Sequence, residues 1–488
     1  ATCSRLTSIC KNFGVTLVIL RVLGNSQGNI TERLKSLTEE SMAWWGANNI
    51  GSNLNEWQYP VNEFSWGDGN LESKLKSLEY VGEFNFSHQV WNNATALVDE
   101  VLKKLLVEIN IHASRFEGLI FDRYIKQGSA REGLKIRAAD EFDVLLEYHI
   151  EGLRMQPESI SDSRGPIPGL GKMKILNPDY EVENRYATWL RKKIISVNRG
   201  SYFLNSRILH EAVFESLLDK CRENITGSDR QRISFAILRS MNPPSVNLTI
   251  KITQKTGGLF FGVTDIPDVI DIDVVPAMIL KMEEAKGTSG FIECPRYAVV
   301  KWMEESQARA SQFEDPAMIW RLCTSGYEKH YMDLARNDKD KRYIMTACRI
   351  IKTFMSKEKE KSRMNQLPLP ISTFLRSFYL KNIAFYCMLF IKPVSGVQEA
   401  LGYFLGFLNA SLEKGNLPQF FHGNNFLKDD FPSCAQGGRF NLFEHASPDT
   451  LINVRRSFGY VLSRLSGMYD SRAFESDACA RFRDYLNR

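Results

Sequence analysis

The sequence lacks a long uninterrupted apolar segment. The longest apolar run near its start, residues 15–23 (VTLVILRVL), is too short to span a bilayer and contains an arginine. It could belong to the core of a signal peptide, but no convincing cleavage-site pattern accompanies it. We therefore expect a soluble, cytoplasmic protein with no membrane partner.

Paired cysteine motifs are missing as well. The nine cysteines include no C-x-x-C spacing, their number is odd, and several lie in apolar segments. This pattern favours reduced, mostly buried thiols in a cytosolic protein over a disulfide scaffold or zinc ribbon. N-glycosylation triplets are a counter-signal, and their use stays open. They arise often by chance, and the one at Asn247 lies in an expected core strand.

The excess of positive charge is small, at +5 over 488 residues. It does not indicate nucleic-acid binding by itself, so any such surface would have to be a local patch. With 43% hydrophobic and 24% charged residues the composition is typical of a folded protein. The length predicts two or three domains.

Hydrophobic spacing divides the chain into three regions. Residues 1–82 show little pattern and are expected to form an N-terminal extension of unknown role. Apolar residues three and four apart from Leu97 to Ile109 predict a long amphipathic helix. That helix opens a mixed region over 83–285, in which we expect strands near 141–147, 245–253 and 268–278, a loop over 164–172 and a helix over 184–197. Helical patterns dominate residues 286–488.

Two pairs of acidic residues interrupt apolar strands. Glu141 and Asp143 lie one residue apart, and Asp271 and Asp273 have the same spacing in DVIDIDVVPAM. Strand side chains alternate between faces, so the members of each pair point the same way and repel each other. A solvated edge strand would explain one such pair, and Asp271 could be a salt-bridge partner or a strand cap. Three carboxylates converging from neighbouring strands instead suit two Mg²⁺ or Mn²⁺ ions.

A Gly-Ser pair precedes the first acidic strand by about a dozen residues. Glycine lets backbone N–H groups approach a phosphate closely, and the hydroxyl of Ser129 adds a donor, so Gly128 and Ser129 suit a triphosphate. A Gly-Ser turn alone is common and carries little weight. The ordered combination of this pair, an apolar-flanked E-x-D and a distant D-V-V-P is far more specific.

A family resemblance rests on these segments. GSAREGLKIRAADEFDVLL and DIDVVPAM are similar to the nucleotidyltransferase signature of cyclic GMP-AMP synthase and its Mab-twenty-one relatives, and more remotely to oligoadenylate synthase. The likeness continues through WRLCTSGYEKHYM, RIIKTF and SFYLKNIAFYCM and covers roughly residues 90–470. It implies an α+β, bilobal, polymerase-beta-like fold. A mixed-sheet lobe and a C-terminal helical lobe would be joined by a long spine helix.

The resemblance assigns roles to the acids. Glu141 and Asp143 would bind both metal ions, and Asp273 would complete the metal site and help to deprotonate the attacking ribose hydroxyl. These three are the expected catalytic residues. Asp273 is preferred to Asp271 because the family's acid directly precedes the V-[LV]-P-like stretch, whereas spacing alone leaves both open.

The resemblance also assigns nucleotide contacts. Arg321 matches a position that contacts the acceptor base, and Phe378 stands where the synthase has a base-stacking tyrosine. Without the resemblance, Lys352 and Arg321 would be interpreted as surface cations. Positions expected to contact phosphates of the nucleotide are Gly128, Ser129, Lys352 and Ser377.

The segment HYMDLARNDKDKRYIMTAC stands where the vertebrate synthase carries its zinc ribbon. It offers only His330 and Cys348, and a structural zinc site needs four ligands, so we expect no zinc. This absence resembles the invertebrate cGAS-like receptors, several of which respond to double-stranded RNA. We therefore expect RNA rather than DNA as activator, bound by shape across an A-form minor groove, with a dimer on the nucleic acid as one arrangement. Solvated helix faces are the simpler explanation for any single one of the candidate contacts, Lys103, Lys104, Arg191, Lys192, Lys193, Lys341 and Arg342.

The resemblance thus implies an antiviral, innate-immune synthase that joins ATP, GTP or other nucleoside triphosphates into a cyclic dinucleotide. Two alternatives stay open. One is a Mab-twenty-one-type binding protein without activity, against which the retained acids argue. The other is a synthase of linear oligonucleotides, which would use the same metal site.

Overall fold

The computed structural model describes residues 55–64, 68–78, 84–162, 165–228, 233–242, 244–255, 266–286, 291–302, 315–361, 366–391, 393–435 and 438–487. Its contacts divide the chain after Glu56, and Trp57–Arg488 form one compact unit, to which the following description applies. Most of the expected extension over 1–82 lies outside the described residues.

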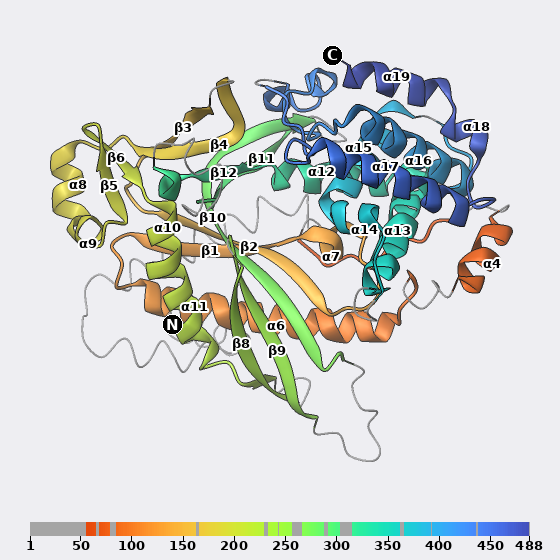
Figure 1. Cartoon of the computed structure of the whole chain (residues 1–488). Helices are drawn as coiled ribbons and strands as arrows, with labels where there is room; N and C mark the ends of the chain where they lie inside the picture. The colour runs from red at the N-terminus through yellow and green to blue at the C-terminus, as the bar shows by residue number, and fades with distance from the viewer. Residues whose placement is uncertain are drawn as a thin grey trace. The chain divides into compact units, whose positions relative to one another are not determined.

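One mixed sheet contains twelve of the described strands (Figure 1). The main path runs β5-β6-β4-β12-β11-β10-β9-β8-β7, while β2 joins β1 to β10 and β3 pairs with β4. The strands are β1 (Leu119–Gln127), β2 (Glu141–Ile150), β3 (Met155–Asp162), β4 (Gly165–Ile175), β5 (Ile195–Asn198), β6 (Ser201–Leu204), β7 (Gly227–Ser228), β8 (Ile233–Asn242), β9 (Ser245–Lys255), β10 (Val269–Lys286), β11 (Phe291–Val300) and β12 (Trp320–Cys323).

The helices fall into two groups along the chain. Those before or between the strands are α4 (Gly69–Ser77), α6 (His88–Ala113), α7 (Gly128–Glu132), α8 (Asp179–Arg185), α9 (Ala187–Arg191), α10 (Ser206–Leu209), η1 (His210–Phe214) and α11 (Glu215–Arg222). Those after β11 are η3 (Pro316–Met318), α12 (Ser325–Arg336), α13 (Lys339–Glu360), α14 (Pro370–Phe374), α15 (Ser377–Phe390), α16 (Val397–Lys414), η5 (Asn425–Leu427), η6 (Pro432–Cys434), α17 (Pro448–Arg464), α18 (Ser471–Phe474) and α19 (Asp477–Leu486).

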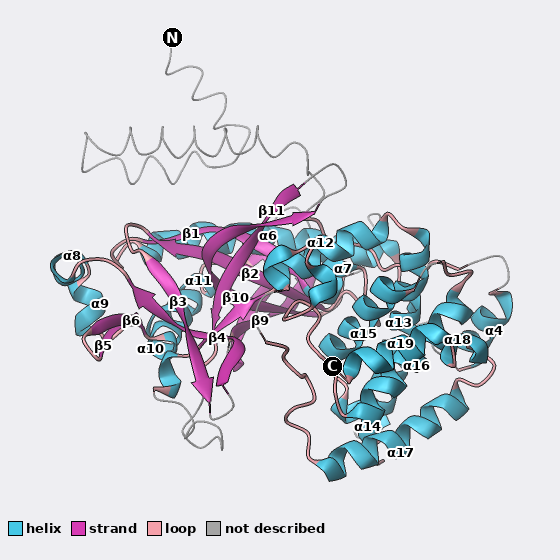
Figure 2. Cartoon of the chain, turned by 90° about the horizontal axis from the view of Figure 1, so that it is seen from above, coloured by secondary structure: helices cyan, strands magenta, loops and turns pink. Residues whose placement is uncertain are grey.

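The expected long helix is α6, and it packs along one face of the sheet (Figure 2). Its start is fixed by Ser87, whose hydroxyl accepts from the backbone N–H of Gln89 at 3.2 Å. Its buried stripe, which includes Leu97 and Val101, shares a core with residues of β2 such as Phe142. The three- and four-residue spacing therefore predicted both the helix and its buried face.

A second core fills the helical part, which lies to one side of the sheet in Figure 1. Helices α13, α15 and α16 contribute fully buried residues to it, among them Ile350, Phe385 and Phe404. The α+β class is confirmed. The sheet continues through β11 and β12, beyond residue 285, where we expected the first region to end.

Two local predictions are wrong. The expected loop over 164–172 is mostly strand β4, which pairs with β3, β6 and β12. The expected helix over 184–197 breaks at Tyr186 and ends with α9. Lys193 then adopts a left-handed backbone with φ 58°, which turns the chain into β5.

The described residues bear on the expectations about membrane-spanning segments and cysteines. No helix among them is both long enough and apolar enough to cross a bilayer. Every cysteine in these ranges is a free thiol, and all but Cys323 are buried.

Candidate active site

The two acidic pairs meet on neighbouring strands. Strands β2 and β10 run parallel, and their register places Glu141 beside Asp271 and Asp143 beside Asp273. Partners in register point to the same face of a sheet, so the four carboxyl groups share one side. The alternation within each strand indicated two pairs, and the strand pairing joins them.

The charges of this group are poorly compensated. The pKa of Asp143 is raised from 3.8 to about 7, chiefly by burial and then by the charges of Glu141 and Asp273. Burial also raises the pKa of Asp273, against the effect of Asn247 Nδ2, which donates to Asp273 Oδ1 at 2.9 Å. Burial therefore disfavours the charged form of the Asp143 carboxyl group.

Glu141 is held differently, because its side chain is 60% exposed and lies beside a cation. The Nζ of Lys135 is 3.1 Å from Glu141 Oε2 and 3.3 Å from Asp140 Oδ1. This ammonium holds the pKa of Glu141 below its usual value. Lys135 was not singled out from the sequence, where only a lysine six residues before the acid could have signalled it.

The Gly-Ser pair opens the short helix α7 directly against the acids. Gly128 has a φ of +67°, which favours glycine, and a Cβ at this position would overlap the carboxylate of Asp143. Glycine is thus required here both for the backbone conformation and for the close approach. The next residue, Ser129, lines a cavity in front of the acids.

This cavity has a volume of about 350 Å³. Glu141, Asp271 and Asp273 line it on the sheet side, and Ser129 and Ser377 contribute hydroxyl groups. Acids and cations therefore face one space, as binding of a polyphosphate together with divalent ions requires. The cations that line it are Lys135, Arg137, Lys352 and Lys359.

Lys352 and Ser377 reach the cavity from the helical part. Lys352 lies on α13, and its Nζ donates to the carbonyl of Leu134 at 2.8 Å. Burial lowers the pKa of this lysine to about 8. Ser377 is the first residue of α15, so the positive end of that helix dipole is directed at the same space.

Arg321 and Phe378 are not among the residues that line the cavity. Arg321 is an exposed residue of β12, opposite Val299 and Leu170. Phe378 packs against the helical core, with Lys381 Nζ 5.7 Å from the centre of its ring. Their assignment to base contacts therefore stays a prediction.

The candidate nucleic-acid contacts lie on three separate elements. On α6, Lys103 is exposed, whereas Lys104 forms an ion pair with Glu100 at 2.8 Å. Arg191, Lys192 and Lys193 are exposed at the end of α9. On α13, Lys341 and Arg342 contact acidic neighbours, Arg342 Nε being 3.1 Å from the carboxylate of Glu63. No continuous basic surface follows from these positions.

A segment within the expected extension also contacts the site region, which the sequence did not predict. The backbone N–H groups of Gln58 and Val61 donate to the carbonyls of Ala130 and Gly133, each at 3.0 Å. Trp57 anchors this segment, since its Nε1 donates to Asp99 at 2.8 Å. Residues 57–61 therefore form a strap, the N-terminal strap, across α7.

The donor chemistry fits a divalent cation. Among the described residues, no three His, Cys, Asp or Glu side chains are arranged to hold a metal ion. The register of β2 and β10 nevertheless places the carboxyl groups of both acidic pairs on one side of the sheet, and carboxylate oxygens are the ligands that Mg²⁺ and Mn²⁺ prefer. Glu141, Asp143 and Asp273 are the residues that could hold such ions.

Comparison with known proteins finds no family model that matches the chain and no curated protein that matches it significantly in sequence.

Proposed function

We propose that the chain is a bilobal, polymerase-beta-like nucleotidyltransferase that joins two nucleoside triphosphates into a cyclic dinucleotide. We further propose that it acts in the cytoplasm as an innate immune sensor and that double-stranded RNA activates it. The observation that carries the proposal is the parallel register of β2 and β10, which aligns Asp143 with Asp273 beside Gly128. The cavity in front of them supplies cations and hydroxyl groups for a triphosphate.

In the proposed reaction a ribose hydroxyl attacks the α-phosphorus of a nucleoside triphosphate. The new P–O bond forms as the bond to pyrophosphate breaks, and the hydroxyl proton leaves toward a carboxylate. Asp273 suits this step, because burial raises its pKa and so makes it a better proton acceptor than an exposed aspartate. Ser129, Lys352 and Ser377 would hold the triphosphate in line with the attack.

Glu141, Asp143 and Asp273 would hold the divalent ions. The chemistry that two such ions supply when bound is activation of the attacking hydroxyl and stabilisation of the leaving pyrophosphate. The protein's contribution is the negative charge of Asp143, which its position against Gly128 keeps close to the other acids.

The proposed activator would be held by basic residues of α6 and α9. Exposed cations at Lys103 and at the end of α9 offer phosphate contacts, and the separate basic positions favour recognition of duplex shape over base sequence. Mobility shifts with RNA and DNA duplexes of the same length at several salt concentrations test this part. Equal or stronger binding of DNA would contradict it.

The test of activity is incubation of the purified chain with labelled nucleoside triphosphates, Mg²⁺ or Mn²⁺, and each duplex, followed by phosphatase digestion. A phosphatase-resistant product is expected with RNA, and it should be lost in Asp143→Asn and Asp273→Asn. Asp268→Asn is the matched control, since its side chain is 83% exposed and does not line the cavity. A ladder of products would indicate linear synthesis, and no product would indicate a binding protein.

A further inference from the structure

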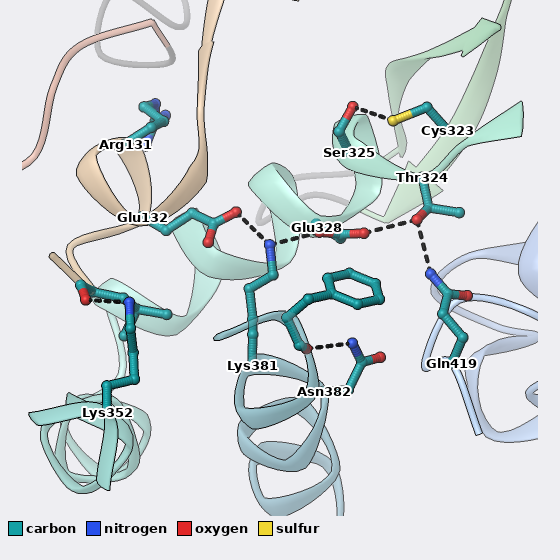
Figure 3. Close-up of polar contacts among 12 residues, drawn as sticks. Arg131, Glu132, Cys323, Thr324, Ser325, Glu328, Lys352, Lys381, Asn382 and Gln419 are labelled. Atoms are coloured by element: carbon teal, nitrogen blue, oxygen red, sulfur yellow. Dashed lines mark hydrogen bonds and ion pairs between the residues drawn. The ribbon is translucent and has the colours of Figure 1, made fainter. Parts of the chain in front are cut away.

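A buried charge network connects α7 to the helical part of the chain (Figure 3). The Nζ of Lys381, on α15, lies 2.9 Å from Glu132 Oε1 on α7 and 2.7 Å from Glu328 Oε2 on α12. The exposed fractions of these side chains are 12%, 3% and 9%. Neither carboxylate can therefore exchange this partner for bulk water without a rearrangement.

The network extends past the two carboxylates. Thr324 Oγ1 donates to Glu328 Oε1 at 2.8 Å, and Gln419 Nε2 donates to Thr324 Oγ1 at 3.0 Å. Figure 3 shows this chain of contacts running from α7 through Lys381 to the loop after α16. Within this network, Lys381 is the cation that contacts both carboxylates, Glu132 and Glu328.

Helix α7 depends on such contacts because it has only five residues, too few to be stable alone. On its other side, Arg131 makes a two-point contact with Asp333, with both N–O distances at 2.9 Å. Arg336 Nη2 donates to the carbonyl of Arg131 at 2.6 Å. Charged side chains of α12 and α15 thus hold α7 from the helical part, while the N-terminal strap donates to the carbonyls of Ala130 and Gly133.

Lys381 also stands at a particular place on its own helix. It follows Ser377 by four residues, so the two side chains lie on the same face of α15, one turn apart. Ser377 lines the cavity, and so does Ser129, which lies three residues before Glu132 on α7. The Lys381–Glu132 contact therefore connects the two elements that bring these hydroxyl groups to the cavity.

We propose that Lys381 is a positioning residue, whose contact with Glu132 sets the spacing between the α7 and α15 hydroxyl groups that would hold the triphosphate. This inference deepens the proposed function and rests on it. The geometry carries it, because the shared cation lies between two carboxylates from elements far apart in the sequence. Misplacement of such groups by about 1 Å can reduce a reaction about a hundredfold.

Three variants test the inference. Lys381→Met removes the cation and leaves two buried carboxylates without it, while Glu132→Gln keeps the side-chain volume and an oxygen that can accept from Lys381. The matched control is Lys172→Met. Lys172 lies on β4, is also 12% exposed and pairs with Asp315 at 3.2 Å, but it does not line the cavity. Hydrogen exchange is followed at the amides of Gly133 and Leu134, which donate to the Ser129 carbonyl.

Lys381→Met is expected to speed exchange at these amides at least tenfold and to raise the KM for nucleoside triphosphate at least tenfold. Glu132→Gln should change both in the same direction by a smaller factor, with its unfolding temperature close to that of the unaltered chain. Adding Glu132→Gln to Lys381→Met should recover part of the loss, because one unpaired carboxylate is removed. Lys172→Met should leave both readouts unchanged.

Two results overturn the inference. One is unchanged exchange of the α7 amides in both Lys381→Met and Glu132→Gln, and the other is an equal effect of Lys172→Met. Failure of the proposed function gives a different result, since the unaltered chain would then form no nucleotide product while the exchange measurement still reports whether Lys381 holds α7.

Discussion

Replacement of Asp143 by asparagine should stabilise the protein while abolishing its proposed activity. The carboxyl has a pKa of about 7 against an ordinary 3.8, so the folded chain keeps a proton that the unfolded chain loses between these pH values. Stability therefore falls as pH rises from 4 to 7, and the full cost is present above pH 7. Asparagine carries no charge at any of these pH values, so the variant does not incur this cost.

The size of the effect follows from the shift. A difference of roughly three pKa units corresponds to about 4 kcal/mol, at about 1.36 kcal/mol per unit. Some of this is lost to relaxation around the charged form, so we expect Asp143→Asn to be more stable than the unaltered chain by about 2 to 4 kcal/mol at pH 8 without divalent ions. The advantage should shrink toward zero near pH 4.

Urea unfolding between pH 4 and 8, with and without Mg²⁺, measures this difference. Mg²⁺ should stabilise the unaltered chain at pH 8, by about 2.7 kcal/mol at a hundred times its dissociation constant, and should stabilise the variant much less. Asp268→Asn, which alters an exposed carboxylate, should stay within about 0.5 kcal/mol throughout. An Asp143→Asn advantage that does not grow with pH, or equal stabilisation of both proteins by Mg²⁺, would refute the reasoning.

Three further substitutions probe the same region. Gly128→Ala should lower the free energy of unfolding by at least about 1 to 2 kcal/mol, because alanine disfavours the left-handed backbone and its Cβ meets a carboxylate, and should reduce product formation at least tenfold in an initial-rate assay. Lys135→Met should raise the pKa of Glu141 and lower the Mg²⁺ concentration that gives half-maximal thermal stabilisation, whereas an unchanged Mg²⁺ midpoint would contradict the role of this ammonium as a competing cation. Trp57→Ala should cost about 3 to 5 kcal/mol in urea unfolding, since the indole is 9% exposed and packs edge-on against Phe142 with ring centroids 4.8 Å apart, and a loss below about 1 kcal/mol would argue against the N-terminal strap.

The sequence predicted secondary structure correctly where a single hydrophobic periodicity extended over a whole segment. The three- and four-residue spacing of α6 and the alternation in β2 and β10 predicted these elements and the side of each strand that carries its acids. Alternation within one strand says nothing about its neighbour, so the alignment of Asp143 with Asp273 came only from the structure. The resemblance suggested that the two strands meet, and it could not give the register.

The missed elements have local physical causes. Strand β4 is rich in glycine and proline, which predict a turn, but a Cβ at Gly171 would lie 2.9 Å from the Glu158 carbonyl on β3. Glycine is therefore needed there for the close approach of two strands, and composition alone cannot distinguish this from a turn. The contacts of Lys135 and Lys381 depend on packing between distant segments, so no spacing rule could have found them.

The parallel pairing of β2 with β10 has a consequence for synthesis of the chain. About 130 residues separate the first acidic strand from its partner, so on the ribosome that partner emerges on the order of ten seconds later. During that interval β2 can pair with β1 but has one edge without its final neighbour, and its acids have not yet met those of β10. The chemistry of the site is thus assembled late, and until β10 has been made the open edge of β2 presents unpaired backbone N–H and C=O groups.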